Sequence, residues 1–281
     1  YIIMPNAQLF VLEGDPDYLC QVFLISENKM RLLGRSSVCH FQINDLKISS
    51  MHCYFIFENN HFAVYDLLSM NGVFVNQNLI DHASLKEGDI IRIGKTVLEF
   101  SIYKGDEEGK KYITGDNPNI VKVVEDADAI NEEASKVTLG RMIKNPKDLV
   151  ICRLAVKNQM LMHETIKDLI RFQEERDADT IEELLVQQGI LTAENITNLL
   201  KEHTYFKARS KDLEFGNVAI ASGLVPEEQV QEFLKEQEDH FTNTKETVRL
   251  GAMLVEKEVL TKHQNNLIIK HLQSQKTDQK K

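Results

Sequence analysis

The sequence predicts a multidomain β + α protein, in which an antiparallel β-sandwich is followed by an all-α helical repeat module. Two observations predict this order: short alternating apolar runs fill residues 8–102, and apolar residues spaced three and four apart follow residue 148. A length of 281 residues also allows two or three domains, each with its own core. We therefore expect a sandwich at 5–103, an acidic linker at 104–147 and a helical module at 148–275.

The first region consists of short segments such as QLFVLEG, YLCQVFLI, HCYFIFENN and TVLEFSI. The segments at 52–57 and 61–66 are joined by Glu58, Asn59 and Asn60, and asparagine tolerates the positive φ angles of a tight hairpin. Many short strands with no helical pattern between them indicate an antiparallel sandwich. The polar segments RSS, NDLKISS and LLSMNG should form loops at its ends.

Residues 104–147 are acidic and polar, contain Gly, Pro and Asn, and show no sustained apolar period. We expect a linker there, mobile at least in part. A phosphorylated Thr114 or Thr138 in such a linker could bind back to the loops of the sandwich. The alternative is that both are ordinary, unmodified linker residues.

The helical region contains an internal repeat. Copies beginning at Thr180, Glu214 and Arg249 each show a short helix, a turn, an apolar pair and a second helix, and a fainter copy begins at Val150. The second helices of the three clear copies have start signals at Thr192, Pro226 and Thr261. Because one helix pair cannot bury its apolar face alone, we predict two tandem pairs, 150–203 and 214–272.

Composition and charge restrict the partners. The chain has 33 Lys and Arg against 43 Asp and Glu, and a formal charge of −10 opposes binding to nucleic acid or anionic lipid. No apolar run is long enough to cross a bilayer and no signal-peptide pattern precedes the first strand, so we predict a cytoplasmic protein without membrane insertion. The four cysteines stand in separate segments, which favours buried reduced thiols and no metal site: Cys20, Cys39, Cys53 and Cys152.

Catalytic motifs are absent from the sequence. It has no nucleophile elbow, P-loop, dinucleotide fingerprint or HExxH motif, so we predict neither an enzyme nor a cofactor. His163 and Glu164 fall in the faint helical copy, where we expect a solvated helix face.

Three sets of polar residues fall in the predicted loops of the sandwich, at 34–37, 49–52 and 66–72. An Arg guanidinium with Ser hydroxyls and a loop Asn suits a phosphate monoester, because each donates hydrogen bonds to anionic oxygens. The order G-R, then S-x-x-H, then D-x-x-S-x-N-G-x-x-V-N, then L-x-x-G-D-x-I-x-I-G resembles the forkhead-associated (FHA) family over residues 8–102.

This resemblance implies an eleven-stranded sandwich whose end loops bind phosphothreonine peptides. It implies that Arg35 and Ser49 contact the phosphate, that Ser50 adds a backbone or hydroxyl contact, and that Asn71 holds the peptide main chain. Four further residues would maintain the loop architecture: Gly34, His52, Gly72 and Asn76.

Two positions depart from the family pattern. Met70 stands where the family often has Thr or a basic residue, and Ser50 stands where it often has Arg. A thioether cannot donate a hydrogen bond, so the pattern predicts a site of modest affinity. The alternative is an FHA fold kept for packing or protein contact alone.

The helical copies resemble the N-terminal domains of type II secretion and pilus ATPases, some of which bind cyclic di-GMP. In this resemblance, Arg249 at the start of one copy and Gln237 at the end of another would contact a nucleotide. No copy keeps both a cationic start and a polar end, so we predict a protein-interaction module rather than a cyclic di-GMP site.

Together these patterns predict a cytoplasmic signalling adaptor. Its sandwich would bind a phosphothreonine-containing protein and its helical module a second protein. The alternatives are a receptor that senses cyclic di-GMP through the helical repeats, or a scaffold that does not depend on phosphate.

Overall fold

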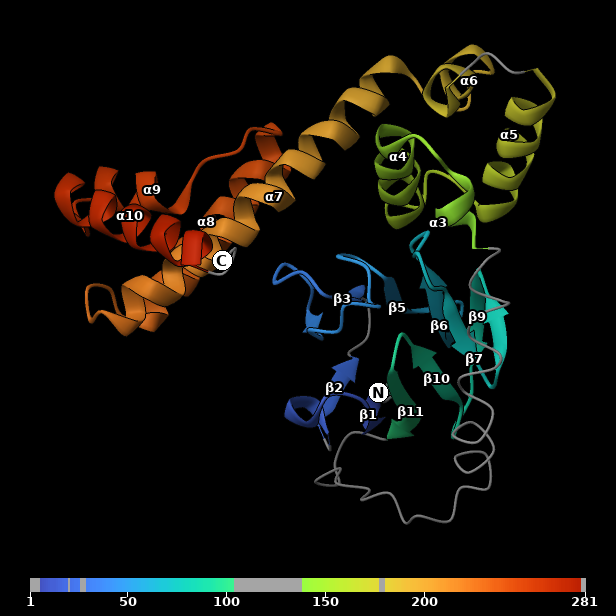
Figure 1. The fold of residues 1–281 in the computed structure, drawn as a ribbon, viewed down its shortest axis with the longest axis horizontal. Coiled ribbons are helices and arrows are strands. Elements are labelled where there is room, and N and C mark those ends of the chain that lie inside the picture. The colour runs from blue at the N-terminus through green and yellow to red at the C-terminus, as the bar shows by residue number, and fades with distance from the viewer. Residues whose placement is uncertain (1–5, 20, 26–28, 104–137, 177–179, 279–281) are drawn as a thin grey trace. The chain divides into compact units, whose positions relative to one another are not determined.

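The computed structural model describes residues 6–19, 21–25, 29–103, 138–176 and 180–278 (Figure 1). The chain divides into two compact units, Tyr1–Leu191 and Thr192–Lys281. The first unit contains the strands and helices α3 to α6, and the second contains helices α7 to α10. The predicted order of a β-sandwich and then helices is confirmed.

The described residues contain eleven strands in two sheets. The six-stranded sheet has the order β2-β1-β11-β10-β7-β8 and the five-stranded sheet the order β4-β3-β5-β6-β9. The first sheet contains β1 (Asn6–Glu13), β2 (Val22–Ile25), β7 (Val73–Val75), β8 (Asn78–Ile80), β10 (Ile90–Ile93) and β11 (Thr96–Tyr103). The second contains β3 (Arg31–Gly34), β4 (Phe41–Gln42), β5 (Cys53–Glu58), β6 (His61–Asp66) and β9 (His82–Leu85).

Alternating side chains build the core between these sheets. In β1, Ala7, Leu9 and Val11 are buried, as expected where every second residue points to the same face. They join aromatic residues such as Phe62 and Phe100, whose ring centroids lie 5.5 Å apart. The sandwich therefore rests on the period of two that its sequence shows.

The hairpin between β5 and β6 has the predicted turn. Glu58 pairs with His61, and Asn59 and Asn60 between them have φ angles of 48° and 65°. Positive φ at both central residues matches the right-handed twist of the flanking strands. The predicted role of the two asparagines is confirmed.

The helices of the first unit are α3 (Leu139–Met142), α4 (Pro146–Lys157), α5 (His163–Arg176) and α6 (Ile181–Gln187). They appear in green to yellow in Figure 1. Helix α3 and the start of α4 fall within the last ten residues of the segment that we expected to be a linker. Thr114 and most of that segment lie outside the described residues.

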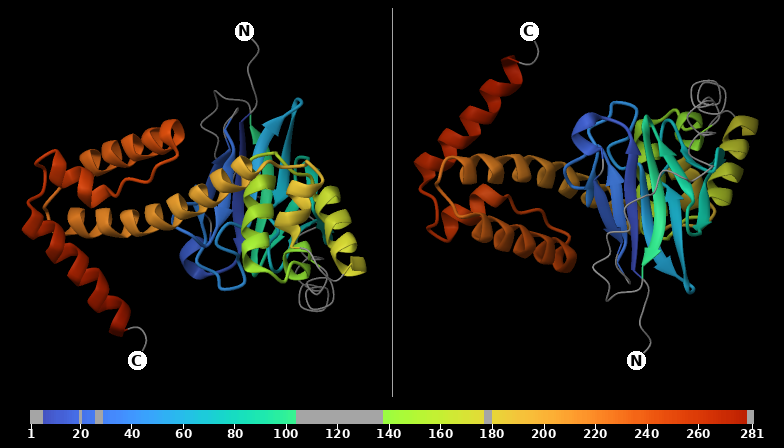
Figure 2. Two further views of the ribbon diagram at one scale, coloured as in Figure 1. Left: turned by 90° about the horizontal axis from the view of Figure 1, so that it is seen from above. Right: turned by 90° about the horizontal axis from the view of Figure 1, so that it is seen from below.

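The second unit consists of α7 (Ala193–Ala221), α8 (Glu227–Thr244), α9 (Leu250–Glu256) and α10 (Lys262–Asp278). The start signals at Thr192, Pro226 and Thr261 are confirmed, because each stands immediately before one of these helices. Helix α7 is continuous over 29 residues and is seen lengthwise in Figure 2. It joins the two tandem pairs that the repeat pattern separates between residues 203 and 214.

Two further predictions concern cysteines and membranes. Cys39, Cys53 and Cys152 are free and buried, as expected, and Cys20 lies outside the described residues. In the ranges that the structure describes, no helix is both long and apolar enough to cross a membrane.

Candidate functional site

Three loops meet at one end of the sandwich, and they are the three that the sequence singled out. The amide of Arg35 donates to the Ser49 carbonyl at 3.0 Å, and the amide of Ser36 donates to the Ser50 carbonyl at 3.0 Å. The Ser49 hydroxyl accepts a hydrogen bond from the Met70 amide at 3.1 Å. Backbone and side-chain bonds therefore hold the loops at 34–37, 49–52 and 66–72 together.

Arg35 and Ser50 are exposed, and Ser49 is half-buried between them and the third loop. Arg35 Nε donates to the Ile48 carbonyl at 3.3 Å, which fixes the base of the guanidinium. Because Ser49 Oγ accepts from Met70, its own hydroxyl hydrogen can be donated to a ligand.

His52 connects two of the loops from below. It is fully buried, and burial lowers its pKa to about 4, so the ring is neutral. Nδ1 accepts from the Ser49 amide at 3.0 Å, which leaves the hydrogen on Nε2, and Nε2 donates to the Gly72 carbonyl at 3.0 Å. A neutral imidazole with one acceptor and one donor fits this position.

The structure also explains why three other residues of the loop architecture are Gly or Asn. A Cβ on Gly34 would lie 2.4 Å from the Ser50 carbonyl oxygen, so only glycine lets these loops approach. Gly72 has a φ of 77°, which favours glycine. Asn76 fixes the β7–β8 turn, because Nδ2 donates to Asp89 Oδ1 at 2.8 Å and Oδ1 accepts from the Ile90 amide at 2.9 Å.

Asn71 contacts a residue that no sequence motif indicated. Its Nδ2 donates to the Lys47 carbonyl at 2.5 Å, and its Oδ1 accepts from Arg141 Nη2 at 2.8 Å. Arg141 Nε also donates to the Met70 carbonyl at 2.5 Å. Arg141 belongs to α3, inside the segment that we expected to be a linker, so no local spacing could have predicted this contact.

Helices α4 and α5 hold the same loop from another side. Arg153 donates from Nε to the Leu67 carbonyl at 2.8 Å and from Nη2 to the Leu68 carbonyl at 3.0 Å. His163 Nε2 donates to the Asp66 carbonyl at 2.8 Å. The helical segment of the first unit thus supplies donors to successive carbonyls of the loop that carries Met70 and Asn71.

Two sequence predictions need correction here. His163 was expected on a solvated helix face, which is wrong: it is 3% exposed, whereas the neighbouring Glu164 side chain is 67% exposed. Thr138 was expected in a mobile linker but is 4% exposed, and its hydroxyl donates to the Met70 carbonyl at 3.2 Å. Both residues are polar in sequence, and only their packing against a distant loop buries them.

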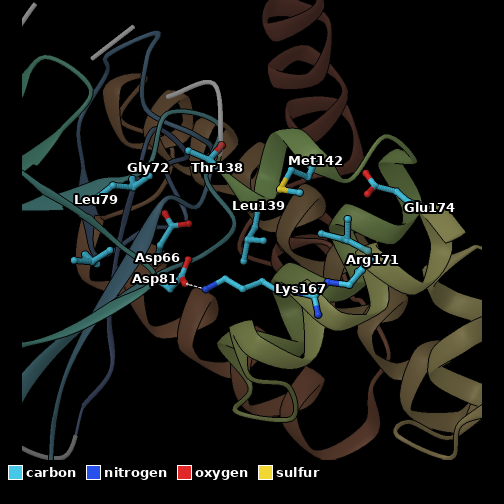
Figure 3. A pocket seen from close by; sticks show the side chains of 12 residues that line it. Asp66, Gly72, Leu79, Asp81, Thr138, Leu139, Met142, Lys167, Arg171 and Glu174 are labelled. Carbon is cyan, nitrogen blue, oxygen red and sulfur yellow. Dashed lines mark hydrogen bonds and ion pairs between the residues drawn. The ribbon is translucent and has the colours of Figure 1, made fainter. Parts of the chain in front are cut away.

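A cavity of about 420 Å³ lies beside this loop, between the sandwich and helices α3 and α5 (Figure 3). Asp66 faces it: Oδ2 accepts from the Ser69 amide at 3.0 Å, and Oδ1 has no hydrogen-bond partner among the described residues. Burial raises the pKa of Asp66 to about 7. Lys167 and Asp81 form an ion pair at the same cavity.

The two residues considered for a nucleotide lie together in the second unit, around Asp212. Arg249 Nε donates to Asp212 Oδ1 at 2.8 Å, and Gln237 Nε2 donates to Asp212 Oδ2 and to the Val248 carbonyl, both at 2.6 Å. Gln237 Oε1 accepts from Arg209 at 3.1 Å, so both polar ends of this buried side chain have partners inside the unit. Arg249 remains half-exposed and borders a cavity of about 830 Å³.

Comparison with known proteins concerns the sandwich. Residues 31–94 match the family model of the FHA domain. The glycogen accumulation regulator GarA of Mycobacterium tuberculosis is 33% identical over 96 residues, which make up 34% of this chain and 58% of GarA. GarA of Mycolicibacterium smegmatis is 37% identical over 67 residues, 24% of this chain and 42% of that protein. The chain therefore spans less than two thirds of the length of these relatives.

Solved structures give similar matches over the same region. The FHA domain of CT664 from Chlamydia trachomatis is 25% identical with a TM-score of 0.33, covering 35% of this chain and 98% of that chain. The MEK1 FHA domain, solved with a phosphothreonine peptide of HOP1, is 30% identical with a TM-score of 0.30, covering 35% of this chain and 97% of that chain. The family match and the two-sheet topology identify the sandwich at the start of this chain as an FHA domain.

Proposed function

We propose that the chain is a cytoplasmic signalling adaptor whose FHA domain binds a phosphothreonine-containing segment of another protein. The observation that carries the proposal is the meeting of Arg35, Ser49 and Asn71 at one end of the sandwich, on loops that hydrogen bonds fix to one another. Fixed loops lower the entropy cost of binding. Binding, rather than catalysis, is the activity that this set of side chains supports.

The phosphate would lie against Arg35 and Ser49. Arg35 is exposed and anchored through Nε, so its remaining NH groups can donate charge-assisted hydrogen bonds to phosphate oxygens. The Ser49 hydroxyl donates a further bond, and the exposed Ser50 stands next to it. Asn71 has a second amide hydrogen and a second oxygen lone pair with which to hold the peptide main chain.

The helical module forms the second part of the proposal, as a docking site for a second protein. Helix α10 exposes Leu267 at 51% and Ile269 at 39%, which suits contact with an apolar partner surface. We do not assign a nucleotide to this unit, because Gln237 is fully engaged inside it.

Titration calorimetry with phosphothreonine peptides tests the first part. Replacing Arg35→Ala should weaken binding by about 10- to 100-fold, since a hydrogen bond to a charged group contributes about 1.5–3 kcal/mol. Arg171→Ala is the matched control, because Arg171 is an exposed arginine on α5 whose ion-pair partner is Asp168. Its affinity should equal that of the unaltered chain.

Two results would contradict the proposal. One is that the unaltered chain binds no peptide from a phosphothreonine library. The other is that Arg35→Ala binds as tightly as the unaltered chain, which would favour a scaffold that does not depend on phosphate.

A further inference from the structure

Helix α3 brings a second arginine to the phosphothreonine site. Among residues 34–37, 49–52 and 66–72, Arg35 is the only Lys or Arg. Arg141 comes from outside these loops and is exposed, with Nε on the Met70 carbonyl at 2.5 Å and Nη2 on Asn71 Oδ1 at 2.8 Å. It therefore places a positive charge on the loop where Met70 supplies no side-chain donor.

The backbone that carries Arg141 is firmly seated. A Cβ on Gly140 would lie 2.2 Å from the Leu68 carbonyl oxygen, so the α3 backbone lies directly against the loop. Leu139 and Ile143 on either side are 7% and 5% exposed. The Arg141 side chain itself is exposed, so it can turn toward a ligand without moving the helix.

Arg141 also lies close to the expected position of the phosphate. The Ser49 hydroxyl bonds to the amide of Met70 at 3.1 Å, and Arg141 bonds to the carbonyl of the same residue at 2.5 Å. Since one residue separates the two contacts, Ser49 Oγ and Arg141 Nε lie within about 9 Å of each other. A phosphate group that accepts hydrogen bonds on two of its oxygens can bridge donors up to about 8 Å apart.

We propose that Arg141 is a phosphopeptide-binding residue that supplies the second positive charge of the phosphothreonine site. This inference rests on the proposed function and extends it, because part of the site then comes from outside the FHA domain. The guanidinium leaves Asn71 or shares it, and donates charge-assisted bonds to the phosphate or to the adjoining peptide carbonyl.

The experiment uses the full chain and one phosphothreonine peptide that the unaltered chain binds. Arg141→Ala should weaken binding by about 5- to 30-fold, less than Arg35→Ala because Arg141 must give up or share its bond to Asn71 when it binds the ligand. Arg141→Gln should lose as much, since it keeps an NH donor at the position of Arg141 Nε but neither the charge nor the outer NH groups. Arg141→Lys should fall between Arg141→Gln and the unaltered chain, and Arg171→Ala should change affinity by less than about twofold.

Salt dependence distinguishes a charge at the site from a structural role. If Arg141 contacts the phosphate, Arg141→Gln should make peptide affinity less sensitive to added salt, whereas loss of packing alone would leave that sensitivity unchanged. The thermal midpoint of each variant, measured alongside, shows whether the fold is preserved.

Each other outcome overturns the inference. Equal affinity in Arg141→Gln would show that the charge is not used, and tighter binding in Arg141→Ala would show that α3 competes with the peptide. If binding depends on Arg35 but not on Arg141, this inference fails and the proposed function stands. If the unaltered chain binds no phosphothreonine peptide, both fail.

Discussion

Both halves of the helical repeat contain a buried aspartate at an equivalent position, and the surroundings of that aspartate differ between the halves. Asp148 in α4 and Asp212 in α7 both follow a lysine, precede a leucine, and stand two positions before a repeat copy. Asp148 accepts from the amides of Ile181 and Glu182 at 3.0 and 3.1 Å, at the start of α6. Asp212 accepts from the amide of Leu250 at 3.2 Å, at the start of α9. In each half, a buried carboxylate caps a later helix.

The neighbours of the two aspartates differ. Asp212 also accepts hydrogen bonds from Arg249 and Gln237, so these partners of Asp212 all lie within the second unit. In the first unit, the donors of α4 and α5, Arg153 and His163, instead bind the loop carbonyls of the sandwich. The shared residues therefore fix the helix arrangement within each half, and the residues that diverge decide what each half attaches to.

The largest expected effect is a difference in lost stability between alanine variants of the two aspartates. Asp212→Ala leaves Arg249, Gln237 and the Leu250 amide without their acceptor, so the local free energy of unfolding should fall by about 3–5 kcal/mol. Asp148→Ala removes a cap with two amide bonds and should cost about 1–2 kcal/mol. Amide hydrogen exchange of the full chain, followed over 250–256 and 181–187, measures both. Equal losses would show that the extra partners of Asp212 contribute nothing.

The next effect concerns two glycines with different neighbours. A Cβ at Gly140 would meet the Leu68 carbonyl oxygen at 2.2 Å, which is backbone, whereas at Gly251 it would meet Asn265 Oδ1 at 2.3 Å, which is the end of a side chain. Gly140→Ala should therefore destabilise the first unit by about 1–3 kcal/mol.

Gly251→Ala should change stability by less than about 1 kcal/mol, because Asn265 can turn and alanine favours the helix. Urea unfolding of the two variants tests the contrast. A similar loss for both would mean that α3 and the loop can separate as easily as one side chain can move.

The smallest expected effect distinguishes Asp66 from Asp212. Asp66 faces a cavity and one of its oxygens has no hydrogen-bond partner within the described part of the chain, whereas both oxygens of Asp212 accept hydrogen bonds. The pKa of Asp66 is raised to about 7, so its protonated form stabilises the fold at low pH, and that contribution is lost as pH rises from about 4 through 7. His52, with its pKa lowered to about 4, acts in the opposite sense, because the unfolded chain binds a proton below its ordinary pKa of about 6.5.

Asp66→Asn removes only the first contribution. Its stability relative to the unaltered chain should therefore rise with pH between 4 and 7, by at most about 1.4 kcal/mol per pH unit. Urea unfolding at several pH values measures the difference. Parallel curves for the two proteins would show that Asp66 is ionised throughout.

The sequence alone determined those features that depend on neighbours along the chain. The period of two in the strands, the Asn59-Asn60 hairpin and the helix starts at Thr192, Pro226 and Thr261 follow from local backbone preference and burial of one face. The loops with Arg35, Ser49 and Asn71 were found for the same reason, because each belongs to a short motif.

Only the tertiary structure decided the contacts of Arg141, Arg153 and His163. Arg153 and His163 are polar residues in a helical segment, where periodicity assigns polar side chains to solvent, and Arg141 lies in the segment expected to be a linker. Each bonds a carbonyl or side chain 70 to 97 positions earlier. The structure also makes α7 continuous across residues 203 to 214, since no Gly or Pro interrupts that stretch. A buried carbonyl needs a donor, and which distant side chain supplies it depends on how the elements pack, which local spacing does not encode.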